Sequence, residues 1–367
     1  MRVRTSRPQV MRPKPKSMAK RGDGIENPSP NGDRTMSDKL LRWGVFSTSN
    51  IGRAAVNPAI QASSNGELLA VASREEGKAR EFAEKAGIPR HYGSYEDLLE
   101  DERIEAVYNP LPNSLHKEWT IRAAEKGKHV LCEKPLALNA SECREMEAAA
   151  TANGVKLLEA FMYRFHPRTE KVLEMIGAGV VGDLKQIRST FTFPLTRPED
   201  IRWNGELGGG ALMDVGCYCV NVSRTMVGRE PVEVRAMANF RAPGVDEQMA
   251  GTLRFDDGLL AHFDCALTME RTEAYQIHGT EGHLRIRKAF LPGTEDAVIE
   301  QFDNDNELTT IWVDGADEYK LMVEHFADCV LNDRPLRYTA EEAALNMKVI
   351  EALYESAGKE GEVVAIP

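Results

Sequence analysis

Residues 41–63 read LRWGVFSTSNIGRAAVNPAIQAS, and this stretch decides the fold of the chain. Its first part, 41–47, is an almost continuous apolar run, which predicts a strand buried on both faces. Its last part, 52–63, predicts a helix. A buried strand that turns at once into a helix is the opening unit of a nucleotide-binding α/β domain.

The turn between that strand and helix departs from the usual dinucleotide fingerprint. The fingerprint expects glycine at Ser47, Ser49 and Gly52, and only the last is present. The small side chains of this turn still allow close approach, and the helix start offers N–H donors to a pyrophosphate. We therefore predict a cofactor turn, with a helix capped by Ser and Asn chemistry as the alternative.

The pattern continues outward from this unit as strands separated by helical stretches. Further short apolar strands are predicted at 67–74, 106–111, 128–135 and 155–161. Strands that alternate with helices indicate βαβ units and a doubly wound parallel sheet.

The texture changes after about residue 183, where long strands follow one another through turns such as Asp257-Gly258. This pattern predicts a large, mostly antiparallel sheet that is open on one face. The expected fold is α/β, with a Rossmann domain at 38–160 and an α+β substrate-binding and dimerisation domain at 161–367. Ligands of doubly wound sheets bind at the carboxyl ends of the strands, so a site is expected where the two domains meet.

Composition excludes several classes of protein. The chain of 367 residues has a net charge of −11, which argues against nucleic acid as the main partner. No apolar run approaches the ~18 residues of a membrane span. Six cysteines are too few for a disulfide framework, and no His or Cys cluster has metal-site spacing. A reducing cytoplasm is the expected location, with no metal bound.

The first 37 residues differ from the rest of the chain. Residues 1–35 hold nine Lys or Arg against three acids, with almost no large apolar side chain, which predicts a disordered basic tail. A misannotated start, with Met36 as the true first residue, is an equally open interpretation. A basic arm that touches membrane or nucleic acid is a third.

The end of the second strand indicates the cofactor. An NAD site places an acid there to bind the ribose hydroxyls, whereas this chain has Ser73-Arg74. A guanidinium can bind a 2′-phosphate, so NADP is predicted. NAD stays the alternative if Glu75 or Glu76 folds back, and Arg74 could also be a solvated residue at a helix start.

Chemistry-bearing residues follow the later strands. NPLPNSLH (109–116) and CEKPL (132–136) each come at a strand's carboxyl end, which places them over the cofactor. The glycine run 208–210 lets the chain approach another element closely before a helix. Asp214 and Tyr218 are four residues apart, so they share one face of that helix.

These motifs resemble the Gfo/Idh/MocA family of nicotinamide-dependent sugar oxidoreductases over residues 40–360. The resemblance rests on the first turn, on PLPNSLH (110–116), EKPLAL (133–138) and EAFMYRFHP (159–167), and on GGGALMDVGCY (208–218). It is strongest to the NADP-dependent branch that holds dimeric dihydrodiol dehydrogenases, D-xylose 1-dehydrogenases and glucose–fructose oxidoreductase. Many other members carry histidine in place of Tyr218.

The resemblance implies a six-stranded, predominantly antiparallel second sheet and a homodimer formed through it. It assigns Lys134, Asp214 and Tyr218 as the catalytic residues. With the motif positions above, the expected cofactor-binding residues are Ser47, Thr48, Asn50, Ile51, Ser73, Arg74, Pro110, Asn113, His116, Glu133, Lys134, Arg202 and Trp203.

The expected function is hydride transfer between NADP(H) and a CH–OH group of a sugar or cyclic polyol. Tyr218 is the predicted general acid/base, with its pKa lowered by Lys134, which also polarises the substrate oxygen. Asp214 is expected to orient a hydroxyl or Lys134. The alternatives are a cofactor-dependent glycosidase of the same family and a non-catalytic NADP-sensing regulator. Arg164 and His166 are placed near the crevice, His166 as a helix-entry residue.

Overall fold

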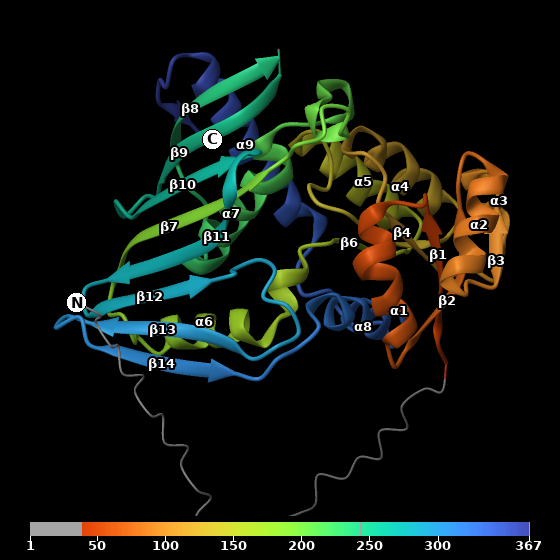
Figure 1. Ribbon diagram of the computed structural model, residues 1–367, viewed down its shortest axis with the longest axis horizontal. Coiled ribbons are helices and arrows are strands. Elements are labelled where there is room, and N and C mark those ends of the chain that lie inside the picture. The colour runs from red at the N-terminus through yellow and green to blue at the C-terminus, as the bar shows by residue number, and fades with distance from the viewer. Residues whose placement is uncertain (1–38, 243, 367) are drawn as a thin grey trace, which may run out of the picture. The chain divides into compact units, whose positions relative to one another are not determined.

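The computed structural model describes residues 39–242 and 244–366, so the expected tail lies outside the described residues. Its first sheet has the order β3-β2-β1-β4-β5-β6, and every pairing in it is parallel (Figure 1). The strands are β1 (Leu41–Phe46), β2 (Gly66–Ala72), β3 (Arg90–Tyr92), β4 (Ala106–Asn109), β5 (His129–Cys132) and β6 (Leu157–Glu159). The predicted doubly wound sheet is confirmed.

Helices follow these strands as the alternating pattern requires. A π-helical turn η1 (Gly52–Val56) leads into α1 (Asn57–Ala62), and the other elements are α2 (Glu76–Ala86), α3 (Tyr95–Glu100), η2 (Asn113–Leu115), α4 (His116–Glu125) and α5 (Ala140–Ala152). Trp43, Val45 and Phe46 of β1 are fully buried, because helices cover both faces of a doubly wound sheet.

The second sheet has nine strands in the order β14-β13-β12-β11-β7-β10-β9-β8-β15. Only the β7–β10 pair is parallel among its described strands. The bounds are β7 (Leu184–Pro194), β8 (Glu233–Ala242), β9 (Val245–Arg254), β10 (Leu260–Ala266), β11 (Thr268–Gly279), β12 (Gly282–Arg287), β13 (Ala297–Asp303), β14 (Leu308–Val313) and β15 (Val364–Ala365).

The expected six strands are therefore too few. The strands from β12 to β8 form a six-stranded centre, and the β13–β14 hairpin extends one edge while β15 extends the other. The hairpin pairs onto β12 through β13, whose first residues alternate between buried and half-buried, as at Ala297, Val298 and Ile299, whereas the residues of β14 are half-buried or exposed. The antiparallel, open character of the sheet is confirmed.

The remaining elements are helical and follow residue 160 in the chain. They are η3 (Met162–Phe165), α6 (Pro167–Gly177), η4 (Ile201–Trp203), η5 (Gly205–Leu207), η6 (Leu212–Gly216), α7 (Cys217–Val227), α8 (Glu318–Leu331) and α9 (Ala340–Gly358). Helices α6, α7 and α9 pack against this sheet, whereas α8 packs against β1, β2 and α1. Phe326 of α8 lies with its ring centroid 5.3 Å from that of Trp43. The domain boundary at residues 160/161 stays a prediction. Helix α8 comes after this boundary in the chain, and yet it packs against the parallel sheet of the first domain.

Candidate active site

A cavity of about 370 Å³ is bordered by segments that are far apart in the chain. Five segments contribute to its wall. They are the first βα turn, the 110–113 loop, the EKP loop (Glu133-Lys134-Pro135), the 201–209 segment and the helix formed by η6 and α7. Of the residues singled out from the sequence, the structure brings together here Ile51, Pro110, Asn113, Glu133, Lys134, Arg202, Asp214 and Tyr218.

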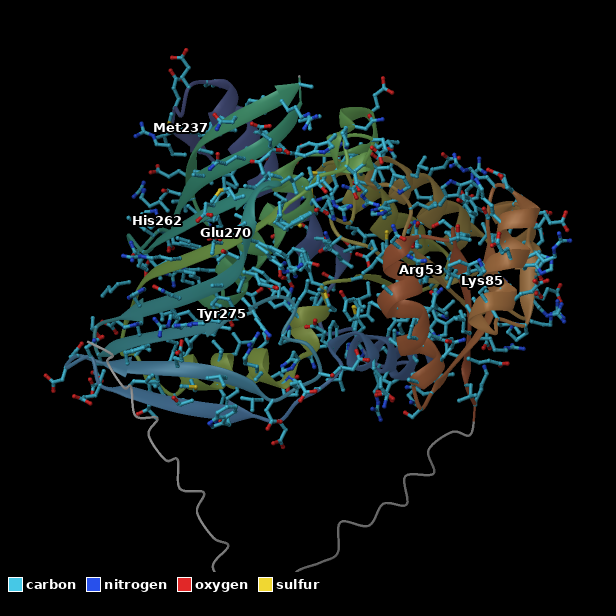
Figure 2. All side chains as sticks on the ribbon, in the orientation of Figure 1. Arg53, Lys85, Met237, His262, Glu270 and Tyr275 are labelled. Carbon is cyan, nitrogen blue, oxygen red and sulfur yellow. The ribbon has the colours of Figure 1, made fainter. Side chains whose placement is uncertain are left out.

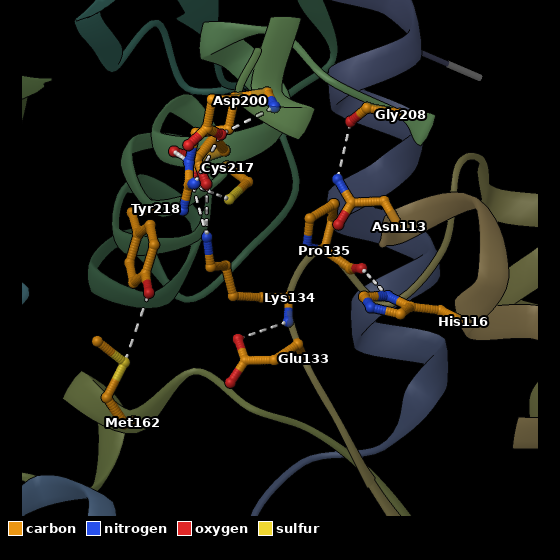
Figure 3. Close-up of polar contacts among 12 residues, drawn as sticks. Asn113, His116, Glu133, Lys134, Pro135, Met162, Asp200, Gly208, Cys217 and Tyr218 are labelled. Carbon is orange, nitrogen blue, oxygen red and sulfur yellow. Dashed lines mark hydrogen bonds and ion pairs between the residues drawn. The ribbon is translucent and has the colours of Figure 1, made fainter. Parts of the chain in front are cut away.

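Lys134 is tied to the helix opposite its own loop (Figure 3). Its Nζ donates to the backbone oxygen of Asp214 at 2.7 Å and lies 3.4 Å from Oδ1 of the same residue. It also stands 4.9 Å from the centroid of the Tyr218 ring. Burial opposes the charge of Lys134, but Asp214, Cys217 and Glu133 outweigh it and raise the lysine pKa. Lys134 is therefore an ammonium at neutral pH.

Asp214 lies between two cations. Its Oδ2 accepts from Arg202 Nε at 2.6 Å, and Arg202 also donates to Asp200 at 3.1 Å. Burial raises the pKa of Asp214, but Lys134 and Arg202 together bring it below its ordinary value. The carboxylate stays ionised, so it orients the two cations and has no proton to exchange at neutral pH.

Tyr218 is buried among aromatic rings, those of Phe161, Phe191 and Phe290 lying within 5.4 Å, centroid to centroid. Its hydroxyl points to the sulfur of Met162 at 3.5 Å. Burial, followed by the nearby Tyr319 and Glu133, raises its pKa well above the ordinary value. The expected lowering of this pKa by Lys134 is wrong for this structure, because the ammonium lies over the ring and desolvation of the phenolate dominates.

Glu133 adds a half-buried carboxyl to the same wall. Tyr108 donates its hydroxyl to Glu133 Oε1 at 2.6 Å, and the Lys134 N–H lies 3.3 Å from Oε2. Burial raises the pKa of Glu133, with Lys134 and the Tyr108 hydroxyl opposing that change. The EKP loop therefore holds the Glu133 carboxyl, a hydrogen-bond acceptor, next to the Lys134 ammonium.

The first βα turn has a strained entry. Ser47 has a φ of 63°, a left-handed conformation that favours glycine, which explains why the fingerprint usually has glycine there. The Gly52 N–H donates to Ser49 Oγ at 3.1 Å, and a Cβ on Gly52 would lie 3.0 Å from that oxygen. The turn is therefore closed by the Ser49 side chain, which leaves little room for a side chain at Gly52.

A second cavity of about 580 Å³ adjoins this turn between α1 and α2. Thr48 and Asn50 border it together with Arg53, Lys78 and Lys85, three cations that sequence reasoning missed, and with Glu81, which pairs with Lys85. The available signal was the position of Lys78 in the first turn of α2, close in sequence to Arg74. A cavity that joins the cofactor turn to several cations fits an extra phosphate on the cofactor.

Ser73 and Arg74 lie just after β2 and border neither of these two cavities. Glu75, which would have to fold back to support NAD, instead pairs with Lys78 at 2.6 Å, and Glu76 begins α2. Glu75 therefore holds Lys78, one of the cations of the second cavity, in an ion pair.

Two residues expected to bind the cofactor have other surroundings. His116 is fully buried, with Nδ1 3.0 Å from the Pro135 oxygen and Nε2 2.8 Å from the Leu111 oxygen. Burial lowers its pKa to about 4, so the neutral ring donates to one of these two carbonyls. His116 thus packs between two loops of the site and does not border the cavity. Trp203 borders a different cavity, and the Arg241 guanidinium lies 4.5 Å above its ring.

The two remaining residues of the expected crevice are structural. His166 caps α6, its Nδ1 accepting from the Arg168 N–H at 3.0 Å, so its prediction as a helix-entry residue is confirmed. Arg164 pairs with Glu342 and lies 4.0 Å from the Tyr338 ring centroid. Within residues 39–242 and 244–366, no cluster of three or more His, Cys, Asp or Glu side chains could hold a metal ion. No helix of this described part is long and apolar enough to cross a membrane.

Comparisons with known proteins identify the family of the chain. Residues 41–161 match the model of an oxidoreductase family with an NAD-binding Rossmann fold, and residues 169–285 match the GFO/IDH/MocA C-terminal domain. The chain is 40% identical over 318 residues to a D-xylose 1-dehydrogenase (NADP(+)) of Haloferax volcanii, covering 86% of this chain and 97% of the relative. It is 36% identical to the trans-1,2-dihydrobenzene-1,2-diol dehydrogenase of Mus musculus, over 69% and 76% of the two chains.

A solved structure shows the same architecture. A 3-ketoreductase from Actinomadura kijaniata, in complex with NADP and TDP-benzene, superposes with a TM-score of 0.83 at 30% identity, covering 87% of this chain and 98% of that one. With two matching domain models and a relative of near full length, the chain belongs to the Gfo/Idh/MocA family of oxidoreductases.

Proposed function

We propose that the chain is an NADP-dependent oxidoreductase that transfers hydride between NADP(H) and a CH–OH group of a sugar or cyclic polyol. The observation that carries this proposal is the meeting of Lys134, Asp214 and Tyr218 on one cavity that also reaches Ile51 of the cofactor turn. The relatives named above are NADP-dependent or diol dehydrogenases, which supports the same substrate class.

The residues of the first turn would hold the cofactor, which supplies or accepts the hydride when bound. Thr48, Asn50 and Ile51 would approach its phosphates. The cations Arg53 and Lys78 of the second cavity, with Arg74 just after β2, favour an additional phosphate over the free hydroxyl of NAD. On the other side, Pro110, Asn113 and Glu133 would face its nicotinamide half.

The protein's own residues would manage the proton and the charge. Lys134 is an ammonium directed into the cavity and can polarise the substrate oxygen. Tyr218 is a neutral phenol, so it can donate a proton to the oxygen of a carbonyl during reduction. Oxidation of an alcohol requires the reverse transfer, and it is therefore expected to need a deprotonated Tyr218 and to accelerate with rising pH.

The discriminating experiment is a dehydrogenase screen that follows absorbance at 340 nm, with NADP and NAD against D-xylose, D-glucose and trans-dihydrodiols. Multiple turnovers with NADP support the proposal. Cleavage of a glycoside without net absorbance change would instead support the glycosidase alternative. Tight NADP binding with no turnover on the whole panel would support the sensing regulator.

We further propose that the protein is a cytoplasmic homodimer that uses the open face of its second sheet. Met237 of β8 is 71% exposed and Trp312 of β14 is 66% exposed, which leaves large apolar side chains open to a partner on this sheet (Figure 2 labels Met237). Across neighbouring strands, Met237 is paired with Ala250, Ala250 with Asp264, and Asp264 with Thr190, so these residues lie on the same face of the sheet. Light scattering of the wild type and of Met237→Arg tests this, and a wild-type monomer would contradict it.

A further inference from the structure

The helix that carries Asp214 and Tyr218 begins without a capping side chain of its own. Neither η6 nor α7 has a side-chain bond at its N-cap, which is Ala211 for η6 and Gly216 for α7. The first N–H groups of a helix have no partner within the helix and need an acceptor when they are buried. The position of this helix therefore depends on a group from elsewhere in the fold.

That group is the carboxylate of Asp246 on β9, which is fully buried. Its Oδ2 accepts from the Leu212 N–H at 2.8 Å, and its Oδ1 accepts from the Tyr354 hydroxyl of α9 at 2.7 Å. A carboxylate at the start of a helix is stabilised by the N–H groups and the positive end of the dipole. Asp246 thus caps the helix from the sheet, and Tyr354 holds the carboxylate in place.

The glycine run before the helix is what allows this approach. A Cβ on Gly210 would lie 2.3 Å from Asp246 Oδ1 and 3.0 Å from the Tyr354 hydroxyl. Gly210 also has a φ of 115°, which side-chain-bearing residues rarely adopt. The sequence predicted a close approach at 208–210. At Gly210, the group that approaches the backbone is the buried carboxylate of Asp246.

The cap lies two residues from the centre of the site. The capped N–H is that of Leu212, two residues before Asp214. Asp214 accepts from Lys134 with its backbone oxygen and from Arg202 with its carboxylate. A shift of the helix start would move these bonds together, because the intervening residues are in one hydrogen-bonded turn in which Asp214 N–H donates to Gly210.

We propose that Asp246 is a positioning residue for the proposed reaction: by capping the helix from β9, it sets where Asp214 and Tyr218 stand relative to Lys134. This inference rests on the proposed function for its effect on turnover, whereas the cap itself can be tested without any substrate. Neither Asp246 nor Tyr354 borders the main cavity, so their effect would pass through the helix.

The test compares Asp246→Leu, which removes the acceptor, with Asp246→Asn, which keeps one. Asp246→Leu should lower kcat about 100-fold, since a misplacement of about 1 Å has that effect, with the dissociation constant of NADPH changed less than about 2-fold. Asp246→Asn should recover to within about 10-fold of wild type, because Asn caps helices nearly as well as Asp. Ser94→Ala, which removes the cap of the remote helix α3, is the matched control and should leave kcat unchanged.

Hydrogen exchange supplies a readout that needs no activity. Amides 211–218 should exchange faster in Asp246→Leu than in wild type, while those of α3 stay unchanged. A folded Asp246→Leu with wild-type kcat, or with unchanged exchange at 211–218, would overturn the proposal. If Asp246→Leu does not fold, Gly210→Ala takes its place, with the same losses expected and the same results counting against the cap. A wild type that turns over no substrate would remove the proposed function, and the exchange result would still decide the cap.

Discussion

Replacing Tyr218 by phenylalanine takes one hydroxyl out of the cavity and leaves its surroundings nearly intact. That hydroxyl makes a weak contact to Met162 sulfur at 3.5 Å, and the ring keeps its partners, Phe161 at 5.1 Å and Phe290 at 5.2 Å. The free energy of unfolding should therefore change by less than about 0.5 kcal/mol. Turnover should fall about 10²- to 10⁴-fold if the hydroxyl transfers the proton.

The pH dependence sharpens this prediction. Burial raises the pKa of Tyr218, so the phenol holds its proton over the neutral range and the deprotonated form needed for alcohol oxidation grows as pH rises. Initial rates at 340 nm between about pH 6 and 10 should rise with pH for oxidation in the wild type, and this rise should be absent in Tyr218→Phe. NADPH affinity, measured by fluorescence, should stay nearly unchanged.

The matched control is Tyr163→Phe, in the same aromatic cluster. The Tyr163 hydroxyl donates to Asn221 at 2.5 Å, and its ring lies 6.1 Å from that of Tyr218. Its loss should lower stability by about 1 kcal/mol without lowering turnover. Wild-type turnover in Tyr218→Phe, or equal losses in both variants, would refute the assignment of Tyr218 as the proton donor.

Two further predictions concern the cofactor and pH. Arg74→Glu, alone or with Lys78→Glu, should raise the KM for NADP at least about 10-fold and the KM for NAD less than about 3-fold, because only NADP carries the 2′-phosphate. Equal increases in the two KM values would contradict the cofactor assignment. Burial raises the pKa of Glu159 to about 8 from its usual 4.5, so the folded protein favours the protonated acid. The contribution of this protonated side chain to the free energy of unfolding is complete below about pH 4.5 and is lost as pH rises through about 8. That loss amounts to up to about 5 kcal/mol, and chemical denaturation of Glu159→Gln should show a flatter stability profile between pH 5 and 8 than wild type; parallel profiles would count against it.

Much of the site was predictable because its residues follow strands. Lys134 comes two residues after the end of β5, and Pro110 comes directly after β4. Parallel strands end at one edge of their sheet, so the two segments were expected to meet. Spacing likewise placed Asp214 and Tyr218 on one helix. The structure brings Lys134 and Tyr218 together as that reasoning required.

Other features depend on contacts between residues remote in sequence. Lys78 and Arg53 border one cavity because α1 and α2 lie side by side, and the acid that caps the Asp214 helix comes from β9. The direction of the Tyr218 pKa was predicted wrongly because it depends on how completely the phenol is buried, and no pattern in the sequence measures desolvation.

The amino-acid sequence by itself determined the parallel sheet and the edge of that sheet at which a ligand is expected, because both follow from periodicity and local spacing, which act over a few residues. The lysine, the acid and the tyrosine of the site were implied by the resemblance of their motifs to a known family. Only the tertiary structure decided the nine-stranded sheet, the burial of His116 between two loops, the protonation of Tyr218 and the cap from Asp246. Each of these is a property of burial or of atoms brought together from distant segments, and such packing exists only once the chain has folded.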